Sequence, residues 1–375
     1  MRWVLVLVVA CGSPAAMPDA APPGTLDESF GIGGVVQVAG GTATDVALVG
    51  SDLVVFGAGG GDLVVTRLSA SGVLDGVVAD THVAGPLGTP DGGMATLPDG
   101  HLALPAFDRL IRATPDGVVD ATFGSAGIVA VPSHEAWHTV LAVGDRLVIC
   151  GTFDRGSPQP LARRLDAAGA VDATFGSGGL AVAAAGLGTI FNCRAQADGA
   201  LVLVGRQSNA AIVGRMSADG ALDATFGSGG FEVVTAAADA RALVIGADGD
   251  YLVAGAIAGD FGVARLTPSG AVATAIATPI GPYPTSAVAL AEAADGTVVA
   301  AGTETSPVDQ SGSSAVVRYT HDGALDTRFG AGGIVQLGAD TRVFALVLQP
   351  DGKIVVAGDT SVDGARGLFV ARLLP

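Results

Sequence analysis

One short stretch of the chain, HEAWH at residues 134–138, has residue types and a spacing that could support metal-dependent hydrolysis. In an H-E-x-x-H motif, two histidines four residues apart lie on one face of a helix and bind one zinc ion, while the glutamate acts as the general base. The motif has this meaning only on a helix. The chemistry of His134, Glu135 and His138 therefore depends on the secondary structure that surrounds them.

The composition describes a chain that is rich in turns and poor in charge. Its 375 residues include 57 glycines and 19 prolines, and only 15% of them are charged, against about a quarter in an average domain. Short buried strands separated by glycine turns would account for both properties. A single lysine and a formal net charge of −17 argue against nucleic acid and anionic lipid surfaces as partners.

The sequence repeats itself with a period near 50 residues. The clearest copies of the repeated block are LDESFGIGGVV, VDATFGSAGIV, VDATFGSGGLA, LDATFGSGGFE and LDTRFGAGGIV, and two weaker copies fill the gaps between them. The seven copies begin at Leu26, Leu74, Val119, Val171, Leu222, Val272 and Leu325. Repetition at this spacing indicates one repeat architecture over residues 26–375.

Each repeat contains four short strand candidates, which residues 334–337, 342–348, 353–358 and 368–373 illustrate in the last copy. Asp-Gly pairs, as at Asp351–Gly352, separate the second and third candidates, as tight hairpins prefer. No stretch has the period and the caps of a ten-residue helix. Four strands in each of seven repeats predict an all-β fold, a seven-bladed β-propeller.

A second regularity predicts how each repeat is held together. An arginine ends the fourth strand candidate, an aspartate follows eight residues later in most repeats, and a phenylalanine follows three residues after that. The predicted structural ion pairs are Arg67 with Asp75, Arg112 with Asp120, Arg164 with Asp172, Arg215 with Asp223, and Arg318 with Asp326. Because most of these arginines have a matched aspartate, we interpret these residues as structural and not as an anion-binding cluster.

The array of repeats begins and ends at different positions within the repeated pattern. The first repeat opens with LDESFGIGGVVQV, and the last repeat ends on FVARLLP without a further copy of the opening block. The strand at 35–38 should therefore complete the last blade, formed by residues 342–373. Such closure removes the open edges of the first and last blades.

The blocks LDATFGSGG, LQPDGKIVVAG and FVARL resemble the delta-60 repeat β-propeller family of bacterial secreted and surface proteins. The resemblance covers residues 26–375 and is weakest in the second and sixth repeats. It implies a propeller, and it implies neither a reaction nor a ligand.

Within this repeat, HEAWH falls between a strand candidate at 127–131 and the next at 137–143, so it is predicted to be a loop that enters a strand. Residues four apart on a strand are separated by about 13 Å, too far to share one metal ion. We therefore expect no metal site. The glycine-rich stretch at 57–61 lacks the lysine and the helix of a phosphate-binding loop, so no cofactor is expected either.

The same segment can instead contribute to a binding site. If the second strand candidate of each repeat is innermost, the loops before it gather at one mouth of the central channel. The candidate ligand-binding residues are His134, Glu135, Trp137, His138, Tyr283, Asp340 and Arg342. An aromatic ring among polar loops suits contact with a sugar or a peptide, although Trp137 could equally pack into the fold.

The N-terminus is predicted to direct export. Residues 1–10 have one arginine and an apolar run too short to span a bilayer, as in a signal peptide. VVAC, residues 8–11, resembles a bacterial lipobox. This resemblance implies lipidation of Cys11, an outer-membrane location facing either the periplasm or the outside, and a tether over residues 11–25. Cys150 and Cys193 lie in apolar strand-like runs and are expected to be two separate buried thiols, although an oxidising compartment would let them pair.

Two functions remain open at this stage. The first is a monomeric, membrane-anchored, non-enzymatic module that binds a protein, a peptide or a glycan. The alternative is a propeller hydrolase or lyase with its active site at the channel mouth, for which Glu135, Glu304, Asp309 and Arg342 are the candidate residues. Carboxyl groups about 5–10 Å apart in a pocket would favour hydrolysis.

Overall fold

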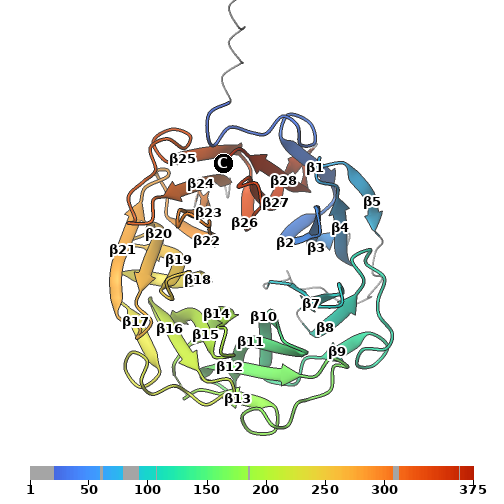
Figure 1. Cartoon of the computed structure of the whole chain (residues 1–375), viewed down its shortest axis with the longest axis vertical. Helices are drawn as coiled ribbons and strands as arrows, with labels where there is room; N and C mark the ends of the chain where they lie inside the picture. Colours follow the sequence, from blue (N-terminus) through green and yellow to red (C-terminus); the bar gives the residue numbers. More distant parts are fainter. Residues whose placement is uncertain are drawn as a thin grey trace, which may run out of the picture.

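The computed structural model describes residues 21–59, 62–78, 93–106, 108–184, 186–306, 312–362 and 364–375. Within these residues the chain forms 28 strands and no helix. The strands make seven antiparallel sheets of four strands each, arranged as blades around a central axis (Figure 1). The predicted seven-bladed β-propeller is confirmed.

The blades follow one another along the chain. Blade 1 contains β2 (Thr42–Val49), β3 (Asp52–Gly59), β4 (Asp62–Leu68) and β5 (Leu74–Val78). Blade 2 contains β6 (Ala95–Thr96), β7 (Leu102–Ala106), β8 (Arg109–Ala113) and β9 (Ile128–Ala130). Blade 3 contains β10 (Glu135–Val143), β11 (Arg146–Asp154), β12 (Pro158–Leu165) and β13 (Leu180–Val182). Blade 4 contains β14 (Thr189–Ala195), β15 (Leu201–Gln207), β16 (Ala210–Met216) and β17 (Phe231–Val234).

The remaining three blades complete the ring. Blade 5 contains β18 (Ala237–Ile245), β19 (Tyr251–Ile257), β20 (Asp260–Leu266) and β21 (Val272–Thr278). Blade 6 contains β22 (Thr285–Glu292), β23 (Val298–Thr305), β24 (Gly312–Tyr319) and β25 (Ile334–Ala339). Blade 7 contains β26 (Arg342–Leu348), β27 (Ile354–Val362), β28 (Ala365–Leu373) and β1 (Val35–Ala39).

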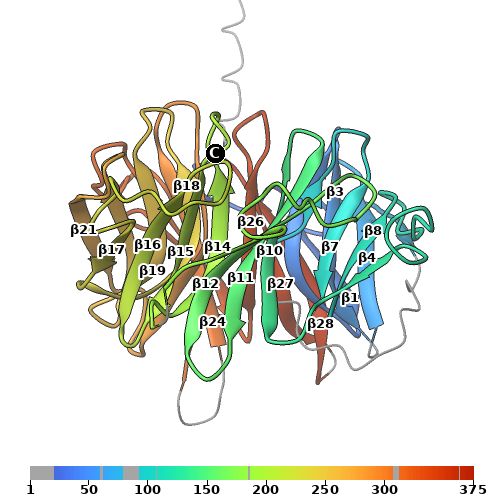
Figure 2. The ribbon, with the colours of Figure 1, turned by 90° about the horizontal axis from the view of Figure 1, so that it is seen from below.

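In blades 1 to 6 the innermost strand is the first in sequence, as β2 and β10 show in Figure 1, and in blade 7 the innermost strand is β26 and the outermost is β1. Seen from the side, the strands run along the height of the ring (Figure 2). Because every blade repeats the same antiparallel order, the ring has two different faces. We call the end of the ring at which the innermost strands begin the entry face. The opposite end, where tight turns join the innermost strand of a blade to the next strand, is the turn face.

The ring closes through pairing of the first and last strands of the chain. β1 pairs antiparallel with β28, with Val35 opposite Ala371 and Val38 opposite Leu368. Next to this pairing, Arg372 Nε donates to Asp27 Oδ2 at 2.9 Å, and both side chains are buried. The N-terminal strand therefore completes the C-terminal blade, as the offset of the repeats predicted.

The repeated arginine, aspartate and phenylalanine meet in the turn that follows the third strand of a blade. The Nε atoms of Arg164, Arg215 and Arg318 donate to Asp172, Asp223 and Asp326 at 2.9, 2.7 and 3.0 Å. Each guanidinium also lies over the phenylalanine of its own blade, at 4.8, 5.2 and 4.6 Å from the ring centroids of Phe175, Phe226 and Phe329. Arginine, aspartate and ring thus form one structural unit on the turn face.

Three blades vary this arrangement. In blade 5, Arg265 Nη1 lies 2.7 and 3.3 Å from carboxylate oxygens of Asp248 and Asp250. Arg112 Nε lies 3.3 Å from Asp120 Oδ2 and the same arginine also contacts Asp99. Arg67 pairs with Asp52 and Asp116 at 2.7 and 2.8 Å, while the side chain of Asp75 lies outside the described residues.

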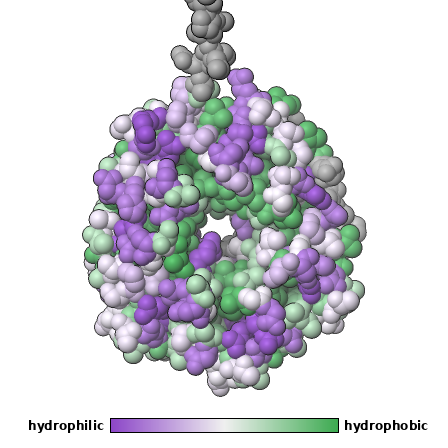
Figure 3. All heavy atoms as spheres, in the orientation of Figure 1, coloured by the Kyte–Doolittle hydropathy of each residue, from purple (hydrophilic) through white to green (hydrophobic). Residues whose placement is uncertain are grey.

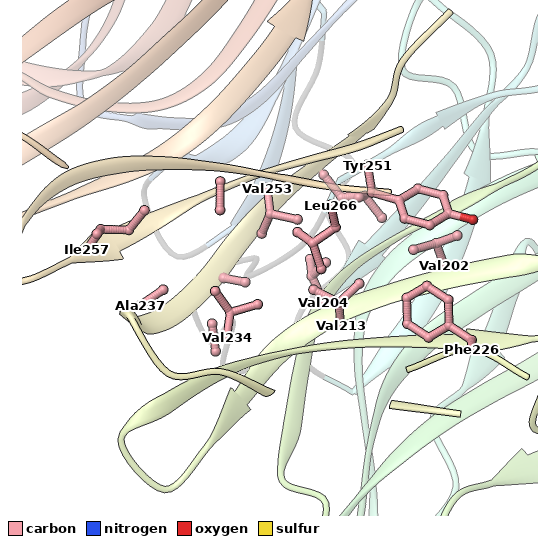
Figure 4. Close-up of a cluster of buried hydrophobic side chains, with 14 residues drawn as sticks. Val202, Val204, Val213, Phe226, Val234, Ala237, Tyr251, Val253, Ile257 and Leu266 are labelled. Carbon is pink, nitrogen blue, oxygen red and sulfur yellow. The ribbon is translucent and has the colours of Figure 1, made fainter. Parts of the chain in front are cut away.

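Apolar side chains from facing sheets form the core between neighbouring blades. Between blades 4 and 5, for example, Val204, Val213 and Val253 are buried in one cluster, and Phe226 packs edge-on against Tyr251 at 5.8 Å (Figure 4). Alternating strand residues point to the two faces of a sheet, so each blade buries one row against each neighbour. This packing holds the innermost strands in a closed ring.

Cys150 and Cys193 form a disulfide, which corrects the expectation of two separate thiols. Cys150 lies on β11 of blade 3 and Cys193 on β14 of blade 4, and both are fully buried, as expected. The sequence separation of 43 between the two cysteines is most of one repeat, so packing of adjacent blades brings the two strands face to face. The bond therefore links two neighbouring blades close to the central channel.

Candidate functional site

A cavity of about 920 Å³ occupies the centre of the ring, where Figure 3 shows an opening between the blades. All seven blades contribute to its wall, through their innermost strands or the residues just before them. The lining includes Thr42 and Arg342 near the entry face, and Ala142 and Ala195 deeper in the channel. Its volume lies at the upper end of the range usual for small-molecule sites.

Bulges in the innermost strands determine which side chains reach this cavity. Five of these strands skip one residue in their pairing with the second strand, and a sixth, β18, skips two, Ala238 and Arg241. The skipped residues that line the cavity are Thr44, His138, Phe191, Arg241, Val288 and Phe344. A side chain in a regular strand would point toward a neighbouring blade, whereas a bulge redirects it. The bulges therefore place one side chain from each of six blades around the channel.

A glycine on the second strand makes room for each bulge. A Cβ atom at Gly151, Gly205 or Gly358 would lie only 1.8–1.9 Å from a backbone oxygen of the innermost strand, so no larger residue fits without moving that strand. The equivalent positions in the other bulged blades are Gly57, Gly255 and Gly302. This glycine is the last residue of the repeated block IVVAG in the seventh repeat.

Arginines and phenylalanines dominate the charged and aromatic part of the wall. Arg241 lies over Phe191 at 5.2 Å and Arg342 lies over Phe344 at 5.7 Å, measured from the guanidinium carbon to the ring centroid. Arg194 also lines the cavity. Its pKa is lowered by burial and raised in part by Asp45, the carboxylate that shares this wall.

Asp45 is the only carboxylate among the described residues that line the cavity. Its two oxygens accept hydrogen bonds from the backbone nitrogens of Val46 and Met94 at 2.8 and 2.6 Å. Burial within the ring raises the pKa of Asp45 to about 6, while these hydrogen bonds and the charge of Arg194 act in the opposite direction. The carboxylate therefore changes charge near neutral pH.

The HEAWH segment begins β10 and contains no helical turn, in agreement with its prediction as a loop that enters a strand. His134 lies before the strand with a positive φ, and its Nδ1 is 3.1 Å from the carbonyl oxygen of Asp154. His138 is the bulged residue and packs edge-on against Phe191 in the channel. The two histidines therefore have different neighbours, and among the described residues no three His, Cys, Asp or Glu side chains are grouped as a metal site requires.

Glu135 and Trp137 are buried in blade 3, where it packs against blade 2. Trp137 is 4% exposed and its indole nitrogen donates to Glu135 Oε2 at 2.8 Å. Arg163 Nε donates to the same oxygen at 2.9 Å. Of the two roles considered for Trp137, this position corresponds to packing.

The other predicted ligand-binding residues surround the entry face. Arg342 reaches the cavity, and its Nε and Nη2 donate to the buried Asp359 at 2.9 and 2.6 Å. Tyr283 is partly exposed and Asp340 has a positive φ of 59° just before β26. Of the seven predicted residues, only His138 and Arg342 line the cavity.

The two glutamates proposed for a hydrolase or lyase, Glu135 and Glu304, do not line the cavity. Glu304 is 6% exposed and accepts a hydrogen bond from the backbone nitrogen of Tyr283 at 2.6 Å. Glu135 is occupied by Arg163 and Trp137, and Asp309 lies outside the described residues. Neither glutamate is part of the cavity wall.

Sequence reasoning did not identify Asp45, Phe191, Arg194, Arg241 and Phe344. A usable signal is present in the repeat itself. The glycine of the second strand marks a bulge on the paired innermost strand, and aligning the repeats on this glycine places Phe191, Arg241 and Phe344 in one column, with His138 one position away.

The fold and the site together define a seven-bladed β-propeller with a charged, partly aromatic central channel. The sequence matches a family described as "Domain of unknown function (DUF5122) beta-propeller" over residues 145–175, 293–329 and 349–375. These three segments include turns and strands of the repeat described above. No curated protein sequence matches the chain.

Solved structures with a similar fold come from several bacteria. A protein from Lactobacillus plantarum is 15% identical with a TM-score of 0.50, and the alignment covers 91% of this chain and 97% of that one. A protein of unknown function from Bacteroides caccae is 12% identical with a TM-score of 0.48, with 80% and 98% covered. A gluconolactonase from Xanthomonas campestris is 14% identical with a TM-score of 0.43, with 75% and 85% covered. At these identities the similarity concerns the fold alone.

Proposed function

We propose that this protein is an exported lipoprotein that is anchored to the outer membrane through Cys11 and binds a ligand, without catalysing a reaction, in the channel of its propeller. The observation that carries the proposal is the central cavity of about 920 Å³, whose wall combines arginines, phenylalanines and a single described carboxylate. Such a wall offers recognition groups. Its described residues do not include the pair of facing carboxyl groups that hydrolysis of a glycosidic bond requires.

The disulfide supports export. Disulfides persist in the periplasm and outside the cell and are rare in a reducing cytosol. Cys150 and Cys193 are paired and fully buried between blades 3 and 4. An exported protein would form this bond as it folds.

The position of the first described residues suits an anchor. Gly24 donates from its backbone nitrogen to the carbonyl oxygen of Leu374, just beyond the end of β28. β28 runs parallel to β26, so this end lies on the turn face, opposite the entry face where Arg342 begins β26. A tether that leaves from the turn face would keep the entry face directed away from the membrane.

Two experiments test the proposal. Cells fed a clickable palmitate should incorporate the label into the wild-type protein and not into Cys11→Ala, and the variant should leave the membrane fraction. A glycan and peptide array probed with the purified protein should show retention that a substitution at the bulged His138 changes. An unlabelled wild-type protein would overturn the anchor, and turnover of any retained ligand would overturn the non-enzymatic role.

A further inference from the structure

The three arginines of the channel each keep hydrogen-bond donors that the described protein groups do not use. Arg241 donates through Nε to Asp239 at 2.8 Å, and Arg194 donates through Nη1 to Asn192 and to the carbonyl oxygen of Cys193 at 2.7 and 2.9 Å. Arg342 uses Nε and Nη2 for Asp359. The described residues accept no hydrogen bond from Nη1 and Nη2 of Arg241, Nε and Nη2 of Arg194, or Nη1 of Arg342.

These arginines are also held in place. The partners named above fix one side of each guanidinium, and Phe191 and Phe344 lie beneath those of Arg241 and Arg342. A planar guanidinium with a free edge recognises a carboxylate through two parallel hydrogen bonds. An anion that enters the channel would meet donors that need little further ordering.

The local charge favours an anion although the whole protein is acidic. The residues that line the cavity include three arginines, Arg194, Arg241 and Arg342, and one carboxylate, Asp45. Asp239 and Asp359 pair with Arg241 and Arg342 and are not part of the lining. The lining residues therefore have an excess of positive charge in a chain of formal net charge −17. Low-dielectric walls strengthen such a field at the site and weaken it outside.

The rest of the wall suits a hydroxylated ring more than an extended apolar chain. Thr42, Thr44, Thr96 and Asn192 line the cavity and supply side-chain oxygens and an amide. Phe191 and Phe344 supply flat apolar surfaces on the same wall. Carbohydrate rings bind through this combination of stacking on aromatic rings and hydrogen bonds to hydroxyl groups.

From these features we infer that the channel binds an acidic carbohydrate, with a sugar carboxylate held by the free Nη1 and Nη2 of Arg241 and a sugar ring against Phe191. The inference rests on the proposed binding function and names its ligand class. It requires no reaction and no metal ion.

Isothermal titration calorimetry of the purified full-length protein tests the inference, with trigalacturonate as the acidic probe and maltotriose as its neutral counterpart. Wild-type protein should bind trigalacturonate at a stoichiometry of one and bind maltotriose at least tenfold more weakly. Arg241→Gln and Phe191→Leu should each weaken trigalacturonate binding by tenfold or more, whereas Asp45→Asn should tighten it by removing a negative charge.

Arg328→Gln is the matched control, because it removes the same charge from an exposed arginine outside the cavity and should leave binding unchanged. Arg241→Lys covers the possibility that Arg241→Gln misfolds, since it keeps the charge and should retain part of the affinity. Equal binding of both trisaccharides, absence of binding, or an unchanged affinity in Arg241→Gln of native melting temperature would overturn the inference. Palmitate labelling and array retention test the anchor and the binding function without reference to the ligand class. The proposed function and the inference about its ligand can therefore fail separately.

Discussion

Reduction of the Cys150–Cys193 disulfide should destabilise the propeller by about 4 kcal/mol. The bond closes a loop with a sequence separation of 43 residues, and the loss of loop-closure entropy in the unfolded chain gives about 13 cal/mol/K for a loop of this size. At 25 °C this amounts to about 4 kcal/mol. Both cysteines are fully buried between blades 3 and 4, so the bond also restrains two blades that contact each other through apolar side chains.

The assay is guanidinium unfolding of the Cys11→Ala chain, followed by tryptophan fluorescence and circular dichroism with and without a phosphine reductant. Reduction leaves every side-chain carbon in place, so the comparison isolates the sulfur–sulfur bond without opening a cavity. Cys150→Ala provides a second comparison, and reductant should have no effect on its unfolding midpoint. Trp137 is buried in the neighbouring core cluster and should report on blade 3.

Two results would refute this reasoning. Thiol titration of the unreduced, unfolded protein could detect two free thiols per Cys11→Ala chain, which would mean that the bond does not form. Alternatively, the bond could form and its reduction could leave the unfolding midpoint unchanged. The unfolded chain would then be restrained by other means, or the folded ring would gain nothing from the link.

Three further predictions concern closure, the bulges and the channel carboxylate. Asp27→Ala should lower the free energy of unfolding by about 3–5 kcal/mol because it leaves the charge of the buried Arg372 without its carboxylate partner. Asp223→Ala removes the aspartate of a more exposed pair and should lower the free energy of unfolding by about 1 kcal/mol. Denaturant unfolding of both variants measures the difference. Gly205→Ala should destabilise the protein by about 1–3 kcal/mol, since its Cβ would lie 1.9 Å from the carbonyl oxygen of Thr189. In the matched control Gly41→Ala, the Cβ would lie 3.4 Å from its nearest neighbouring atom, so the melting temperature should change little. The raised pKa of Asp45, about 6, means that the folded state binds this proton more tightly than the unfolded state, so its contribution to stability is complete below about pH 4 and is lost as the pH rises through 6. The loss is at most about 3 kcal/mol, reduced by water in the channel, and the stability difference between wild type and Asp45→Asn should therefore change between pH 4.5 and 7.5; a constant difference would exclude the shift.

The sequence predicted the fold because the fold depends on patterns that are local or strictly repeated. The block around Phe226 recurs in most repeats, so its turn and its Arg215–Asp223 pair could be placed without knowledge of any other blade. The offset of the first block against the last predicted the pairing of β1 with β28. The absence of helical periodicity around HEAWH was sufficient to exclude the zinc-protease geometry.

The site was predicted only in part, because it depends on where single residues point. Of the predicted residues, His138 and Arg342 reach the cavity, whereas Trp137 is buried against blade 2. One skipped residue in a strand reverses the direction of a side chain, and the sequence of a strand does not state its pairing.

By itself, then, the sequence determined the number of blades, the order of strands, the closure of the ring and the side on which the loops gather. Only the tertiary structure decided which side chains line the channel and that Cys150 meets Cys193. The reason is physical: both outcomes depend on register between strands of different hairpins or blades, where a shift of one residue exchanges a buried side chain for an exposed one.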